Sequence, residues 1–336
     1  MRVRAGVLFR WCRLAVELGI AAGVLGSAVC LAQVGAGERA EEVTVRGFDE
    51  SGLRALWKRH TIDGTSVGAD GTRLGDVNGD GLPDIVTGWE EGGVIRVRLH
   101  PGFANVREKW PGATVGRVRS PEDAVFADLD GDGNLDIISS TEGDDRSIYV
   151  HWSPGQDRLI EESAWRTIPI PEAQGRMRWM FAAPAEIDGR HGIDFFAGGK
   201  DAGGMVGWFA APENARNAGG WRWHPLRETG WLMSLVPEDM DGDGDTDLLL
   251  NDRKGPRRGI FWLEHPGPAH AERVWKEHAI SGEGESETMF LAYEDLDGGG
   301  LKDVIAAVKP RHLEFYRRLH RTGDFAAPAR IPFPAG

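Results

Sequence analysis

An aspartate-rich loop of nine residues recurs along this chain and constrains its fold more than any other feature. Three copies, at 76–84, 128–136 and 239–247, have Asp at positions 1, 5 and 9, Asp or Asn at position 3, and Gly at positions 4 and 6. Two copies, at 186–194 and 295–303, are degenerate. The first positions lie 52, 58, 53 and 56 residues apart. Repetition at roughly 50 residues is typical of propellers and solenoids, so the repeat decides the fold.

The side chains of the loop indicate a hard cation. Calcium takes about six to eight oxygen ligands, which alternate acidic residues in a tight turn can supply. Gly at position 6 lets the chain reverse around the ion, and the carbonyl at position 7 adds a ligand. An EF-hand is the alternative, but its loop ends in Glu at position 12 between helices, whereas these loops end in Asp and enter a short apolar run. The predicted calcium ligands are Asp76, Asn78, Asp80, Leu82, Asp84, Asp128, Asp130, Asp132, Asn134, Asp136, Asp239, Asp241, Asp243, Asp245, Asp247, Asp295, Asp297 and Asp303.

The two degenerate loops are predicted to differ in whether they bind calcium. Arg190 places a cation where a ligand oxygen belongs, and we expect it to pair with Asp188 or Asp194 instead of an ion. Gly299 offers no side chain at position 5 of the last loop. We therefore expect three complete calcium sites, a weaker one at 295–303 and none at 186–194. Asp/Gly turns without metal are the alternative for every copy.

These loops, each followed by an apolar strand, resemble FG-GAP and VCBS repeats, the calcium-stabilised blades of secreted β-propellers, over roughly residues 55–320. The resemblance implies an all-β fold. We expect 55–336 to form a β-propeller of five blades of about 55 residues, because the chain carries five loops. Short apolar segments with Gly/Pro turns and no sustained helical period agree with this. A larger ring with eroded blades stays open as an alternative.

Recurrent aromatic residues and the C-terminal segment complete the predicted blades. The tryptophans that recur at the start of a third segment of the repeat are predicted to be core residues: Trp57, which opens the array, Trp165, Trp223 and Trp275, with Trp110 as a poor match. The segment 325–333 is predicted to close the ring against the first blade.

The N-terminus predicts export. Four arginines precede an apolar segment from about Leu18 to Ala32, so we expect 1–36 to be a cleaved signal peptide and 37–54 a linker. Glu17 leaves the apolar stretch too short for a membrane span. Val29 before Cys30 argues against a lipoprotein signal. The expected location is secreted or periplasmic.

Cysteine content and net charge exclude some stabilising bonds and some classes of partner. Cys12 and Cys30 are the two cysteines of the chain, and both fall in the predicted signal, so no disulfide is expected in the exported domain. The formal net charge of -13 argues against nucleic acid or an anionic membrane as partner. We expect a monomer whose partner is a glycan or an extracellular protein.

The segments just before the loops are the predicted ligand site. They carry different residues in each repeat, as an asymmetric ligand requires, whereas structural positions should repeat. Trp179 and Trp231 could stack on sugar rings, and Arg178, Glu285 and Glu287 could bind hydroxyl or uronate groups. Packing and solvated charge are the alternative for these five residues.

Three functions remain open. The first is a calcium-dependent recognition module for carbohydrate or protein. The second is a carbohydrate-active enzyme, similar to polysaccharide lyases or sugar dehydratases, with Glu287 and Arg178 as base and cation, or with His191, His224 or His278 as base. The third is a structural scaffold. No nucleophile elbow, phosphate loop or His/Cys zinc cluster appears in the sequence. The sequence favours recognition over catalysis.

Overall fold

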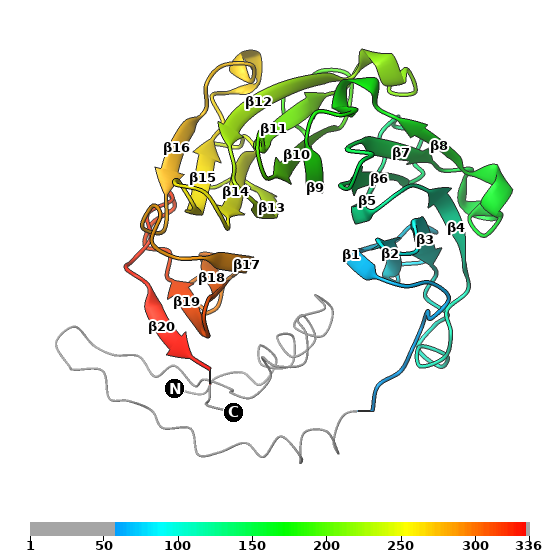
Figure 1. The fold of residues 1–336 in the computed structure, drawn as a ribbon, viewed down its shortest axis with the longest axis horizontal. Helices are drawn as coiled ribbons and strands as arrows, with labels where there is room; N and C mark the ends of the chain where they lie inside the picture. The colour runs from blue at the N-terminus through cyan, green and yellow to red at the C-terminus, as the bar shows by residue number, and fades with distance from the viewer. Residues whose placement is uncertain (1–57, 334–336) are drawn as a thin grey trace. The chain divides into compact units, whose positions relative to one another are not determined.

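The computed structural model describes residues 58–333 (Figure 1). The unit Thr61–Pro332 contains all twenty strands and is described by itself. Five short 3₁₀ turns are the only helical elements of the described residues: η1 (Gln156–Arg158), η2 (Glu162–Ala164), η3 (Pro171–Ala173), η4 (Ala218–Gly220) and η5 (Pro268–His270). The predicted signal peptide, the linker and Trp57 lie outside the described residues. No helix within 58–333 has the length and apolar character of a membrane span.

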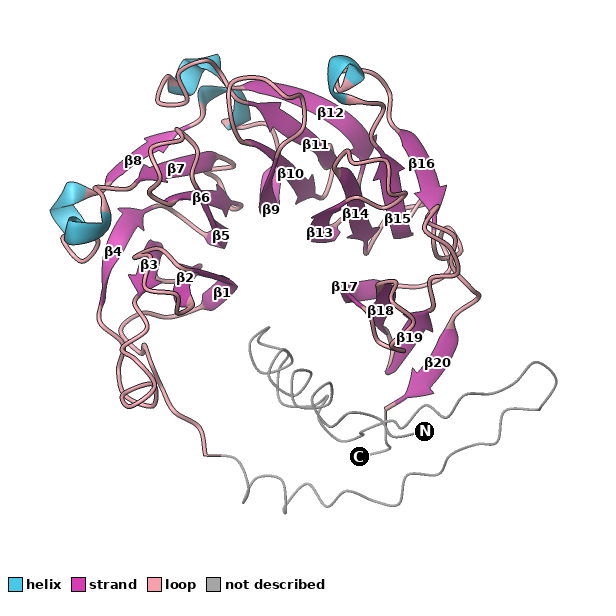
Figure 2. Cartoon of the chain, turned by 180° about the vertical axis from the view of Figure 1, so that it is seen from behind, coloured by secondary structure: helices cyan, strands magenta, loops and turns pink. Residues whose placement is uncertain are grey.

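Five antiparallel sheets, each a meander of four consecutive strands, make up the unit. Sheet 1 contains β1 (Ala69–Gly75), β2 (Asp84–Trp89), β3 (Val94–Arg98) and β4 (Gly112–Arg117); sheet 2 contains β5 (Pro121–Ala127), β6 (Asp136–Thr141), β7 (Ile148–Trp152) and β8 (Arg166–Pro169). Sheet 3 contains β9 (Arg178–Ala185), β10 (Asp194–Lys200), β11 (Met205–Ala210) and β12 (Arg222–Glu228); sheet 4 contains β13 (Leu232–Glu238), β14 (Asp247–Asp252), β15 (Gly259–Glu264) and β16 (Lys276–Ala279). Sheet 5 contains β17 (Thr288–Glu294), β18 (Asp303–Val308), β19 (His312–Tyr316) and β20 (Ala329–Pro332). The first strands of successive sheets face a common centre (Figures 1 and 2).

Consecutive sheets pack face to face, and the apolar runs after the loops form the cores between them. In β6, Ile137 packs with Val86 of sheet 1, whereas its neighbour Ile138 packs with Phe195 of sheet 3. Both isoleucines are completely buried. Because side chains alternate between the faces of a strand, a strand between two sheets is apolar at successive positions. This explains why the second strand of each repeat reads as a continuous apolar run.

A tryptophan before the fourth strand of sheets 1 to 4 recurs as a buried core residue. Its indole N–H donates to a backbone carbonyl four or six residues earlier, at 2.9 to 3.0 Å; the four residues are Trp110, Trp165, Trp221 and Trp275. The prediction is therefore corrected in sheet 3: Trp221 occupies the repeated position, and Trp223 packs partly buried against Trp179. Trp110, a poor match by sequence, occupies the same position in sheet 1.

The prediction of an all-β chain with five repeating sheets is confirmed, but the described residues do not close a ring. The C-terminal strand β20 pairs with β19 as the outermost strand of sheet 5, and not with sheet 1 as predicted. The outward face of sheet 1 carries Arg96 and Arg98, which pair with Asp63 at 2.9 and 2.7 Å. In sheet 5, Phe290 of β17 is 49% exposed.

Candidate metal centres

The five aspartate-rich loops lie at one end of the sheets. Each joins the first strand of its sheet to the second, beginning directly after the first strand and ending with the residue that opens the second. The five loops are therefore equivalent by position, and differences in their residues can be compared directly.

The aspartate at position 9 accepts the same two backbone hydrogen bonds in every loop. In sheet 4, Asp247 Oδ2 accepts a hydrogen bond from the backbone N–H of Met240 at position 2, and Oδ1 accepts one from His265 beyond the third strand, both at 2.7 Å. The same two bonds recur at 2.7 to 3.3 Å from Asp84, Asp136, Asp194 and Asp303. All five aspartates are 0 to 1% exposed. Position 9 thus anchors the loop to the third strand, whether or not the other positions can bind an ion.

The first half of the loop is held by position 1. Its carboxylate accepts the backbone N–H of the residue at position 6, as in Gly81 to Asp76 Oδ2 at 2.8 Å and Gly244 to Asp239 Oδ2 at 3.1 Å. The residue at position 6 has a positive φ in every loop: 81° at Gly81 and 96° at Gly244, but also 37° at His191 of the third loop. A residue with a Cβ is strained in that region, so His191 marks the third loop as a distorted copy.

The carboxylates of three loops converge as a cation requires. Three sets of side chains each bring ligand oxygens within 4.8 Å of one another: Asp128, Asp130 and Asp136; Asp239, Asp241 and Asp247; Asp295, Asp297 and Asp303. Asp128 Oδ1 and Asp295 Oδ1 are buried without a hydrogen-bond partner. A buried orphan oxygen is costly unless something binds it, so these residues fit a hard cation such as calcium.

Burial also opposes the charged state of the position-9 carboxylates. It raises the pKa of Asp136 and of Asp247 to about 7, although backbone N–H donors act in the opposite direction. An opposite charge nearby would favour the ionised forms. This electrostatic environment is consistent with a cation-binding loop.

The remaining loops differ in ligand supply. In the first loop, Asn78 provides an amide at position 3, and its Nδ2 donates to Asp80 Oδ2 at 3.0 Å. In the third loop, Arg190 lies 3.8 Å from Asp188 and 3.4 Å from Glu272 of sheet 4. The expected pairing of Arg190 with Asp188 is confirmed, while its partner in the neighbouring sheet was not foreseen.

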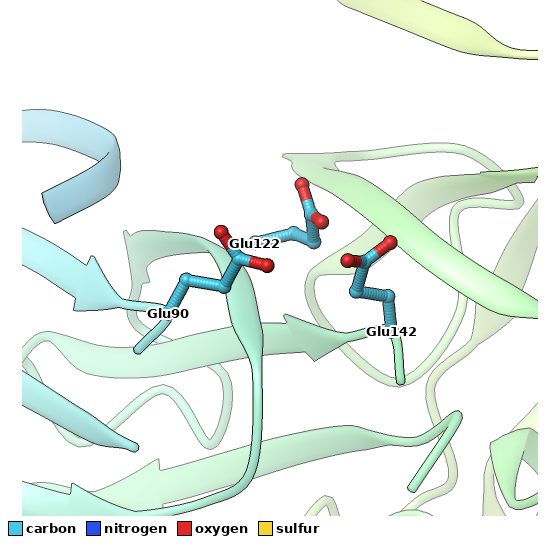
Figure 3. A group of neighbouring side chains, drawn as sticks. All are labelled: Glu90, Glu122 and Glu142. Carbon is cyan, nitrogen blue, oxygen red and sulfur yellow. The ribbon is translucent and has the colours of Figure 1, made fainter. Parts of the chain in front are cut away.

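The opposite end of the sheets carries a different arrangement. Glu90, Glu122 and Glu142 bring carboxylate oxygens within 4.8 Å of one another (Figure 3). Lys200 at the end of β10 pairs with Glu122 at 3.3 Å and also with Glu142. Burial raises the pKa of Glu122, although Lys200 opposes this. The group is a largely buried network that shares one lysine, and Figure 3 shows the three glutamate side chains converging from sheets 1 and 2.

This network belongs to a series that repeats through all five sheets. The residue fourteen positions after the start of each loop is charged in every repeat, and it is the last residue of the second strand or the one directly after it. We call these five residues the charged belt: Glu90, Glu142, Lys200, Arg253 and Lys309. Arg253 and Lys309 both pair with Glu287, at 2.7 and 3.0 Å. The belt is acidic in sheets 1 and 2 and basic in sheets 3 to 5. Sequence reasoning missed it, although aligning the five repeats on their loops would have found it.

The five predicted ligand residues are not gathered into one pocket by any contact of the described structure. Trp179 is completely buried, and its indole N–H donates to Ala173 O at 3.0 Å, so its ring is core. Arg178 pairs with Asp201 at 3.0 Å, and Glu285 is exposed. Glu287 binds the belt residues Arg253 and Lys309, so the base and cation pair of Glu287 with Arg178 is not formed.

Trp231 lies beside the belt, but its ring is surrounded by cations. Lys200, Arg253 and Lys254 lie 4.7, 4.7 and 4.0 Å from its ring centroid. Cation–π contacts of this kind stabilise the arrangement of the basic residues. Trp231 therefore lies against two of the belt residues, Lys200 and Arg253.

Comparison with known proteins agrees with the repeat. The sequence model of a family described as "FG-GAP-like repeat" matches residues 76–139. Residues 76–139 are an FG-GAP-like repeat. This FG-GAP-like repeat runs from the first loop through the second loop into β6. No curated protein matches the chain.

Two solved structures are similar to part of the chain. One is the biofilm matrix protein Bap1 of V. cholerae, at 18% identity and a TM-score of 0.43, covering 82% of this chain. The other is Raptor of Chaetomium thermophilum, at 19% identity and a TM-score of 0.43, covering 79% of this chain. The chain spans 41% and 21% of the lengths of those two chains.

Proposed function

We propose that this chain is an extracellular, calcium-binding repeat module that recognises a charged glycan or protein through the charged belt. The observation that carries the proposal is the belt itself: one position of the repeat is charged in all five sheets, and its sign changes from acidic in sheets 1 and 2 to basic in sheets 3 to 5. A position with a purely repetitive structural role would carry the same residue in each sheet.

Calcium is proposed as the ion of the complete loops. Converging carboxylates, buried orphan oxygens and the absence of nitrogen or sulfur donors among the loop ligands support a hard cation. The ligands are the side chains at positions 1, 3, 5 and 9, with position 7 contributing its carbonyl. When bound, calcium would neutralise the loop carboxylates and stabilise the folded array by mass action. Its role is to fix the sheets that carry the belt.

The proposed recognition is tested by binding to a panel of immobilised neutral and acidic polysaccharides and extracellular proteins, with calcium and with chelator. We expect binding to at least one charged ligand, at least tenfold weaker in the double variant Arg253→Gln/Lys309→Gln. Arg107→Gln is the matched control, because Arg107 is exposed in the connection between β3 and β4 at the loop end. Unchanged binding by the double variant would remove the belt from the proposal.

A further inference from the structure

The second loop is contacted by a cation from the neighbouring sheet. Arg216, in the connection between β11 and β12 of sheet 3, lies with Nε 2.5 Å from Asp130 Oδ2 and with Nη2 3.6 Å from Asp132 Oδ2. Its guanidinium carbon lies 4.8 Å from the ring centroid of Trp152, which helps to hold it in place. Asp130 and Asp132 are positions 3 and 5 of the loop, so Arg216 contacts two of the proposed calcium ligands.

The fourth loop shows what the same oxygens do without such a cation. In both loops, Oδ1 of position 3 accepts the backbone N–H of position 5, at 3.3 Å for Asp130 and 3.1 Å for Asp241. The other oxygen, Oδ2, is paired with Arg216 in the second loop. Among residues 58–333, neither Asp241 nor Asp243 forms an ion pair with Lys or Arg. In the fourth loop, Asp241 Oδ2 is therefore available to an ion. In the second loop, the equivalent oxygen, Asp130 Oδ2, is paired with Arg216.

The third loop contains the same inter-sheet contact with its charges exchanged. There the cation, Arg190, belongs to the loop, and the anion, Glu272, belongs to the connection after the third strand of the next sheet. In the second loop the anions belong to the loop and Arg216 to the equivalent connection. A cation therefore lies at this junction in both places, and the two loops differ in which sheet supplies it.

We propose that Arg216 competes with calcium for the second loop, so that this loop binds calcium more weakly than the fourth despite its complete ligand set. The inference rests on the proposed calcium function. Affinity in such loops follows the charge of the ligand set. Arg216 offsets one of the four loop carboxylates and repels a divalent ion that uses the same aspartate. Calcium that binds there weakens the contact between sheets 2 and 3 that Arg216 makes.

The test is calcium titration of the full chain by isothermal calorimetry, comparing wild type with Arg216→Met. Methionine keeps an apolar stem against Trp152 and removes the charge. We expect about tenfold tighter binding at one site, and the same direction for Arg216→Gln. Arg222→Met is the matched control, because Arg222 is an exposed arginine at the start of β12 that donates to the carbonyls of Gly219 and Trp221.

A second substitution assigns the change to a loop. In an Asp128→Asn background the effect of Arg216→Met should disappear, whereas in an Asp239→Asn background it should persist. Wild-type affinities retained in both Arg216 variants overturn the competition but leave calcium binding intact. No calcium uptake by any variant, with folding verified by circular dichroism, overturns the calcium function itself.

Discussion

The two ends of the sheets differ in how strictly the repeat keeps its residues. At the loop end, the position-9 aspartate makes the same pair of backbone hydrogen bonds in all five sheets, including the sheet whose loop contains Arg190. At the other end, the belt position is always charged but changes sign between Glu142 and Lys200. The comparison separates a position whose residue is the same in every sheet from one that is always charged but varies in sign. Stability should therefore respond most to the first and ligand selection to the second.

The largest effect is expected from the anchor in the loop that is not expected to bind calcium. Asp194→Ala removes the acceptors of the Ile187 and Ala211 N–H groups, which are buried. Each buried donor left unpaired costs about 1 to 3 kcal/mol, so we expect a loss of about 4 kcal/mol in the free energy of unfolding. Urea denaturation measures it, with the same loss in calcium and in chelator. The control Glu186→Ala changes an exposed residue at position 1 of the same loop and should cost under about 0.5 kcal/mol. A small loss from Asp194→Ala would show that position 9 matters only as a metal ligand.

The second prediction converts the third loop into a complete one. Arg190→Asp combined with His191→Gly restores an oxygen at position 5 and a glycine where φ is 37°. We expect one additional calcium per chain in titration, and about 3 kcal/mol of added stability at a calcium concentration 100 times the dissociation constant. His191→Gly alone is the control, because it relieves the backbone without adding a ligand. Unchanged stoichiometry in the double variant would show that the loops differ by more than these two residues.

The third prediction concerns pH at the belt end. Glu122 faces Lys200, Glu142, Glu90 and Asp70, and burial raises its pKa despite Lys200. A carboxyl whose folded pKa is above its unfolded value stabilises the fold below the unfolded pKa of about 4.5, and that contribution is lost as pH rises through the folded pKa. In saturating calcium, wild type should therefore lose about 2 kcal/mol more stability than Glu122→Gln between pH 5 and pH 8.

The control for this pH effect is Glu91→Gln, which neutralises an exposed glutamate beside the same network. Its stability should follow wild type across the range in thermal unfolding. If Glu122→Gln also follows wild type, the buried network does not hold the proton that the raised pKa implies.

The smallest effect is expected from Glu287, a partly exposed partner of two belt residues. Glu287→Gln breaks ion pairs with Arg253 and Lys309, of which Lys309 is 45% exposed. Exposed pairs contribute little, so we expect about 0.5 kcal/mol, decreasing further at high salt. If Glu287→Gln lost as much unfolding free energy as Asp194→Ala, the loop end would not be more important for stability than the belt end.

The sequence predicts the loop end well because its signal is local. Alternate oxygens, a turn glycine and the apolar run after Asp84 or Asp247 all fall within about fifteen residues, and the structure places them in equivalent positions. The error at Trp223 is also local, since Trp221 and Trp223 are two residues apart and point to the same side of the chain. Only the burial of each ring decides between them.

The belt end and the junctions between sheets depend on contacts that the sequence does not encode locally. The sequence pattern predicts Trp179 as a ligand residue because it precedes a loop, but its ring is completely buried in the core. Arg216 and Asp130 are 86 residues apart, and the pairing of Lys200 with Glu122 spans 78. Such pairs become visible only when the packing of one sheet against the next is known.

The division of labour within the loop has an evolutionary consequence. Because position 9 makes the same backbone hydrogen bonds whatever residues stand at positions 1, 3 and 5, a duplicated unit that lost its ion by drift would still fold, and the unit containing Arg190 is the proposed example. Each copy can therefore diverge without endangering its neighbours, and the number of ions in such an array records the history of its units as much as its present needs.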